Sequence, residues 1–181
     1  MFIQTESTPN PATVKFLPDC VVLENGSADF PNAAAAESSP LAKRLFLISG
    51  VKGVFMGHDF ISVTKTESYE WVTLKPQILA AIMEHIASGQ KMAESPSAAL
   101  SPDLVDEISS QIIELIDTRV RPAVAMDGGD IVFDRFEDGV VFLQLRGACA
   151  GCPSSTATLK MGIENMLKHY VPEVIEVRAV A

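Results

Sequence analysis

The stretch V-V-F-L-Q-L-R-G-A-C-A-G-C-P-S-S, residues 140–155, joins an apolar strand pattern to two closely spaced cysteines and a proline. A second apolar run covers residues 131–136, and Asp138-Gly139 between the two runs predicts a β-hairpin. Pro153 at a first helical position, with apolar residues at helical spacing behind it, predicts a helix. The stretch therefore predicts strand, turn, strand, cysteine loop and helix in that order.

Elements on both sides of this hairpin complete the C-terminal half. A helix is expected over residues 104–119 after a Ser101-Pro102-Asp103 start, and Pro122 should end or kink it. Pro172 closes the helix after the cysteines, and residues 174–180 form a last strand. The order α-β-β-α-β is typical of the α+β class, with an antiparallel sheet and helices on one face.

The N-terminal half predicts a second small α+β domain. The expected elements are strands over residues 1–6, 13–17, 51–56 and 60–64, a helix over 41–48 started by Ser39-Pro40, and a helix over 75–88 stopped by Gly89. The small, polar and proline-containing residues 88–102 separate the halves. We therefore expect a first domain over residues 1–89, a linker over 90–101 and a second domain over 102–181.

Composition limits the classes of function. The 181 residues are 48% hydrophobic and carry a formal net charge of −9, so a buried core is expected and nucleic acid is an unsuitable partner. No apolar run approaches the length of a membrane span, and the N-terminus resembles no signal or transit peptide. Three scattered cysteines are too few for a secreted disulfide framework and indicate a reducing intracellular compartment.

The pair Cys149 and Cys152 is the main chemical feature. Cys149 is expected in the turn after a strand, and Cys152 where the next helix begins. Backbone N–H groups and the positive end of the helix dipole lower a thiol pKa there and favour the thiolate. A C-x-x-C pair occurs in zinc sites, iron–sulfur sites and redox motifs, so the spacing alone leaves these three readings open.

Ligand supply separates the three readings. A structural zinc site needs four ligands, and the remaining candidates are widely spaced: Cys20, His58, His85 and His169. A thioredoxin-like dithiol site would follow the first strand of a β-α-β unit, whereas this pair follows a hairpin. An iron–sulfur cluster needs four cysteines, which two chains meeting at this loop would supply on a twofold axis. A dithiol oxidoreductase and a zinc-binding interaction module remain the alternatives.

Other polar residues receive structural interpretations. The segment D-G-G-D, residues 127–130, could bind a cation, but a helix-to-strand turn is favoured. Cys20 is expected to be an ordinary half-buried cysteine, and His85 to face solvent on an amphipathic helix. Arg119 and Arg121 are expected to cap a helix C-terminus.

The C-terminal half resembles the NifU-like C-terminal domain of iron–sulfur cluster scaffold proteins, and the N-terminal half resembles the separate Nfu N-terminal domain. The C-terminal resemblance rests on D-T-R-V-R-P (residues 117–122), D-G-G-D, G-A-C-A-G-C-P-S-S (147–155) and T-L-K-M-G-I-E-N-M-L (158–167). The N-terminal one rests on Q-T-E-S-T-P-N-P (4–11), K-F-L-P (15–18), S-P-L-A (39–42), G-V-K-G-V-F-M-G-H-D-F-I-S-V-T-K (50–65) and W-V-T-L-K-P (71–76).

The resemblance implies a scaffold or carrier without turnover of its own. Its cofactor would be a labile 4Fe–4S cluster, with a 2Fe–2S form as an alternative. The cluster would bridge a homodimer through Cys149 and Cys152 and pass to apo iron–sulfur proteins after loading from an upstream assembly scaffold. The expected location is the bacterial cytoplasm, or the mitochondrial matrix for a processed eukaryotic form.

Overall fold

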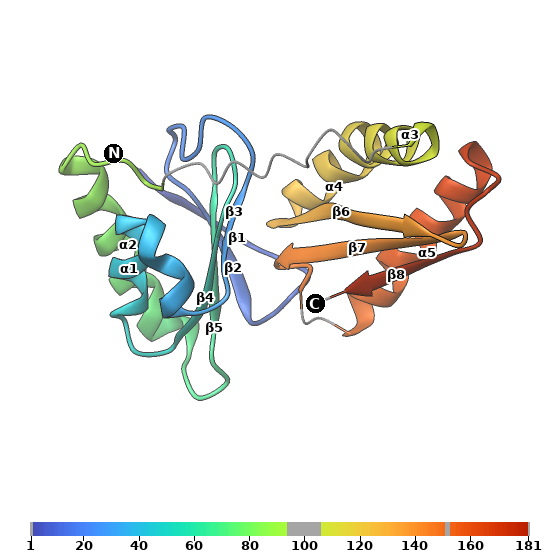
Figure 1. Cartoon of the computed structure of the whole chain (residues 1–181). Helices are drawn as coiled ribbons and strands as arrows, with labels where there is room; N and C mark the ends of the chain where they lie inside the picture. The colour runs from blue at the N-terminus through green and yellow to red at the C-terminus, as the bar shows by residue number, and fades with distance from the viewer. Residues whose placement is uncertain (1, 94–105, 151–152, 181) are drawn as a thin grey trace. The chain divides into compact units, whose positions relative to one another are not determined.

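The computed structural model describes residues 2–93, 106–150 and 153–180, with side chains omitted at 153–155. The chain divides into two compact units, Met1–Pro96 and Ser97–Ala181 (Figure 1). The expected helix start at residues 101–103 and the second cysteine, Cys152, lie outside the described residues.

The first unit is a five-stranded antiparallel sheet with two helices on one face (Figure 1). The strand order is β1 (Gln4–Ser7), β2 (Thr13–Leu17), β5 (Ile61–Lys65), β4 (Val51–Met56) and β3 (Ala28–Phe30). Helix α1 (Pro40–Phe46) lies between β3 and β4 in the chain, and α2 (Trp71–Ala87) follows β5.

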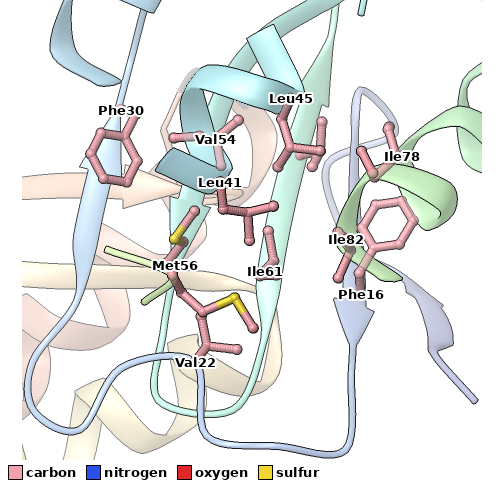
Figure 2. Close-up of a cluster of buried hydrophobic side chains, with 14 of the residues drawn as sticks. Phe16, Val22, Phe30, Leu41, Leu45, Val54, Met56, Ile61, Ile78 and Ile82 are labelled. Atoms are coloured by element: carbon pink, nitrogen blue, oxygen red, sulfur yellow. The ribbon is translucent and has the colours of Figure 1, made fainter. Parts of the chain in front are cut away.

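Apolar residues that alternate along the strands meet the helices in one core. Figure 2 shows Leu41 of α1 beside Met56 of the sheet, and Ile82 of α2 beside Phe16 of β2, with Leu45 of α1 in the same cluster. All five side chains are fully buried, and the burial of their apolar surface stabilises this unit. The expected α+β class is confirmed for this half.

Most expected elements of the first unit are confirmed, with three differences. Ser39 caps α1 as predicted, its Oγ accepting a hydrogen bond from Ala42 N at 3.0 Å. Helix α2 begins at Trp71 instead of residue 75. The helix therefore contains Pro76 in its interior. The short strand β3 was not expected, and neither was the 3₁₀ turn Ala33–Ser38 that follows it.

The chain leaving α2 folds back onto the first unit. Met92 and Ala93 are buried in its core, so the packed chain continues past residue 89. Ser39 Oγ donates to Met92 O at 2.5 Å, and His85 Nε2 donates to Lys91 O at 3.1 Å. The expectation that His85 faces solvent is wrong: it is 0% exposed, because this returning segment covers it.

The second unit has a three-stranded sheet in the order β6 (Gly129–Glu137), β7 (Val140–Gly147) and β8 (Glu176–Val180). Strands β6 and β7 form the predicted antiparallel hairpin, with Asp138 and Gly139 at positive φ in its turn. Strand β8 pairs with β7 in parallel, so the sheet is mixed. Helix α5 (Pro153–Tyr170) provides the crossover that a parallel pair requires.

Helices pack on one face of this sheet. Val141, Leu143 and Val177 are buried strand residues on that face, and they share a single core with Ile112 and Leu167 from the helices. The order α-β-β-α-β is therefore confirmed, with the helical first element divided into shorter pieces. The pieces are α3 (Glu107–Leu115), a π-helical turn (Ile116–Val120) and α4 (Arg121–Met126).

The break in this helix lies where Pro122 predicts it. Pro122 stands in the first turn of α4, where its missing N–H costs nothing because that group has no helical partner. Among the described residues α3 begins at Glu107, and its cap is Asp106, which accepts from Ser109 N at 2.7 Å.

Candidate functional site

The loop that carries Cys149 leaves the central strand β7 and is fixed by backbone hydrogen bonds. Gly147 ends the strand with φ of 62°, a left-handed conformation that favours glycine. Ala148 N then donates to Gly128 O at 3.2 Å. From the first turns of α5, Thr156 Oγ1 donates to Cys149 O at 3.3 Å. Cys149 is thereby held between the end of a strand and the start of a helix, as the sequence predicted.

Gly129 makes the closest approach to the Cys149 side chain. A Cβ atom on Gly129 would lie 2.5 Å from Cys149 Sγ, 2.8 Å from Arg146 O and 3.0 Å from Cys149 N. Two of these neighbours are backbone atoms, which cannot move aside as the end of a side chain can. The second glycine of D-G-G-D therefore forms the surface on which the sulfur rests, and Cys149 is 8% exposed.

An ion pair adjoins this contact. Arg121 Nε and Nη2 donate to the two carboxylate oxygens of Asp130, each at 2.9 Å. Asp130 Oδ1 also accepts from Ile131 N at 2.8 Å, and Arg121 Nη1 donates to Asp117 at 3.2 Å. The hydrogen bonds to Asp130 raise the pKa of Arg121 above its usual value. The expectation that Arg121 caps a helix C-terminus is wrong, because it begins α4 and binds Asp130 instead.

The other predicted ligands do not gather around Cys149. Within the described ranges, no group of three or more His, Cys, Asp or Glu side chains is placed to hold a metal ion. Cys20 is half-buried in the first unit, as expected, and burial, followed by the charge of Asp19, raises the pKa of its thiol. A metal site at Cys149 therefore needs ligands from outside the described residues of this chain. Cys152 is one such candidate.

The two exposed histidines have local contacts. His58 lies in the β4–β5 turn, with its Nδ1 2.8 Å from Leu23 O. His169 lies near the C-terminal end of α5 and makes an edge contact with Tyr170 at 4.9 Å between ring centres. Arg119 lies over the same Tyr170 ring, 4.8 Å from its centre.

The geometry adds Gly129, Arg121 and Asp130 to the two cysteines of the motif. The D-G-G-D segment was interpreted as a turn, and the bond from Ile131 N to Asp130 agrees with that interpretation. Its contact with Cys149 could not be derived from spacing alone, because twenty residues separate Gly129 from Cys149 in the chain. Only the hairpin register, which pairs Gly129 with Gly147, brings them together.

Family models match both units. The model described as Scaffold protein Nfu/NifU N terminal matches residues 3–89, and the NifU-like domain matches residues 112–178. This pair of domains, with a C-x-x-C loop at the end of β7, defines the class of iron–sulfur cluster scaffold proteins. The chain belongs to the NifU-like (Nfu) family, with an Nfu N-terminal domain followed by a NifU-like domain.

Individual relatives agree over most of the chain. It is 54% identical over 177 residues to the human "NFU1 iron-sulfur cluster scaffold homolog, mitochondrial", a match covering 96% of this chain and 70% of that protein. It is 52% identical to "NifU-like protein 4, mitochondrial" of Arabidopsis thaliana, covering 96% of this chain and 64% of that protein. The solution structure of a NifU-like protein from Saccharomyces cerevisiae aligns with a TM-score of 0.48 at 28% identity, over 53% of this chain and 87% of that one.

None of the helices within the described residues combines the length and the apolar character needed to cross a bilayer.

Proposed function

We propose that this protein is an iron–sulfur cluster scaffold or carrier that holds a labile 4Fe–4S cluster between two protomers and delivers it to apo-proteins. Each protomer would supply Cys149 and Cys152, giving the four thiolates that such a cluster requires. The protein would have no turnover of its own. The cluster is its cargo, and an upstream assembly scaffold would load it.

The observation that carries this proposal is the setting of Cys149. Its sulfur packs directly on Gly129, where a side chain would collide with it, so the glycine allows the cysteine to occupy this position. Its backbone is fixed by Thr156 at the start of α5, so ligand orientation is set before a metal arrives. The names of the human and plant relatives support an iron–sulfur cargo, and their mitochondrial designation supports the matrix over the bacterial cytoplasm.

The ligand count supports sharing between chains. Because the described residues of one chain contain no group of three His, Cys, Asp or Glu side chains placed to hold a metal, a closed zinc site is poorly supplied, and a second protomer is the simplest source of further ligands. A cluster held by few ligands at an interface is easily released, as delivery requires. The first domain would dock partner proteins or set the geometry of the dimer.

Anaerobic reconstitution of the full chain with Fe²⁺ and sulfide tests the proposal. We expect four irons and four sulfides per two chains, the visible absorption and Mössbauer spectrum of a 4Fe–4S cluster, and dimerisation that depends on the cluster. A cluster-loaded sample should then activate an apo-4Fe–4S enzyme.

Three results would contradict it. A colourless protein with stoichiometric zinc would indicate an interaction module. A monomer that reduces disulfides with turnover would indicate a dithiol oxidoreductase. A Cys149→Ser/Cys152→Ser double variant that still bound the cluster would remove the assigned ligands.

A further inference from the structure

The ion pair between Arg121 and Asp130 is unusually well built for a small domain. Asp130 is 5% exposed, and its carboxylate receives three N–H donors, two from Arg121 and one from Ile131. A bidentate pair of this kind fixes both distance and orientation, which a lysine at the same position could not do. The pair joins the start of α4 to the start of β6, across the short helix and the turn between them.

Asp130 is one residue from the surface that supports the sulfur. Gly129 precedes it directly, and Gly128 O holds the Ala148 amide at 3.2 Å. A displacement of Asp130 would therefore move the backbone on which Cys149 rests. The contact is tight, since a single added carbon at Gly129 would collide with Cys149 N and Arg146 O.

We propose that the Arg121–Asp130 ion pair is the positioning element of the cysteine loop: it holds Gly128 and Gly129 in place so that the Cys149 sulfur is presented at a fixed site. Arg121 does not touch the cluster in this scheme and acts only through the glycine backbone. The part concerning cluster retention rests on the proposed function, whereas the part concerning the sulfur does not.

Reactivity of the apo-protein measures the positioning directly. Iodoacetamide reacts with Cys149 only when the loop opens, because the side chain is 8% exposed. We expect Arg121→Lys and Asp130→Asn to raise the alkylation rate of Cys149 in the full chain by about tenfold or more, the factor expected for loss of a charged hydrogen bond. Fragment-ion mass spectrometry assigns the label, and Cys20 in the first unit is the internal control, with an unchanged rate.

Two matched variants separate positioning from general loosening. Asp117→Asn removes only the exposed third contact of Arg121 and should leave the Cys149 rate within about twofold. Glu164→Gln removes a carboxylate that accepts from Lys168 and from Val177 N, far along α5 from the loop, and should also leave that rate unchanged. Circular dichroism confirms that each variant is folded.

The double variant Arg121→Lys/Asp130→Asn tests whether the two residues act through each other. Its Cys149 rate should equal that of the faster single variant, because one broken pair cannot be broken again. Multiplied effects, a wild-type rate in both single variants, or an equal acceleration at Cys20 would each overturn the inference.

Cluster retention provides the second readout. In reconstituted protein, the visible absorption of Arg121→Lys should decay about tenfold faster than that of wild type under a ferrous chelator. If wild type binds no cluster while the alkylation results hold, the proposed function fails and the positioning role stands. If clusters bind and persist equally in all variants, the positioning role fails and the proposed function stands.

Discussion

The two units place their cysteines in different settings, although both lie against an apolar core. Cys20 in the first unit lies against an apolar core and next to Asp19, and both features raise the pKa of its thiol and disfavour the thiolate. Cys149 in the second unit rests on the backbone of Gly129, beside the start of a helix. The hairpin register pairs Gly129 with Gly147, two residues before Cys149. Apolar packing surrounds the sulfur of Cys20. The sulfur of Cys149 also contacts a glycine whose neighbouring backbone is hydrogen-bonded to the cysteine loop.

This difference separates a cysteine surrounded by packing alone from one whose neighbouring backbone is also held by hydrogen bonds. An apolar neighbour only fills space around a sulfur, whereas backbone amides and a bidentate ion pair fix its direction.

The largest expected effect is a contrast between the two cysteines. Cys149→Ser should lose the reconstituted cluster completely, because serine removes a thiolate ligand, while Cys20→Ser should retain wild-type iron and sulfide. Iron, sulfide and visible absorption on both variants provide the measurement, with circular dichroism as the check on folding. Full iron content in Cys149→Ser would show that the contrast is false.

A contrast between two glycines of the second unit comes next. Gly129→Ala should destabilise the unit by about 1–3 kcal/mol through overpacking and shorten cluster lifetime. Gly162→Ala should stabilise it by about 0.5–1 kcal/mol, because Gly162 lies in α5 with nothing within 4 Å of an added Cβ. Thermal unfolding of both variants measures the difference, and equal melting temperatures would show that the Gly129 contact is not tight.

Ser39 provides a test confined to the first unit. Ser39→Ala removes both the cap of α1 and the bond to Met92 O, so it should cost about 2 kcal/mol in unfolding free energy. Denaturant unfolding measures this loss. Cluster content per folded chain should stay at the wild-type level, and a proportional fall in cluster would show that the cysteine loop depends on this cap.

The smallest expected effect is a shift in a pH profile. Because the pKa of Cys20 is raised, its alkylation rate should reach half-maximum above the pH of an ordinary thiol. Asp19→Asn should move that midpoint down only part of the way, since burial is the larger cause. The raised pKa stabilises the fold below the unfolded-state pKa of the thiol, and that contribution is lost as pH rises through the folded one. A midpoint unaffected by Asp19→Asn would exclude the charge as a cause.

Local chemistry could be predicted from the sequence wherever a residue acts on its own neighbours. Ser39-Pro40 marks a helix start, Asp138-Gly139 a hairpin and Pro122 a helix break, because capping, positive φ and a missing N–H are properties of the residues themselves. The position of Cys149 between strand and helix was available for the same reason.

Features that depend on distant pairing could not be predicted. The β3 strand has three residues and exists only through its register with β4. His85 is buried because Lys91 and Met92 fold back over it, which no helical periodicity encodes. Arg121 pairs with Asp130 across helix α4 and the turn that follows it, so its role follows from tertiary placement alone.

The parallel pairing of β8 has a consequence for synthesis. The strand that carries the cysteine loop becomes the central strand only when residues 176–180 join its open edge. A growing chain therefore emerges from the ribosome with β7 still as an edge strand and with both thiols already translated. Until β8 joins, that open edge is available for pairing with a strand of another chain.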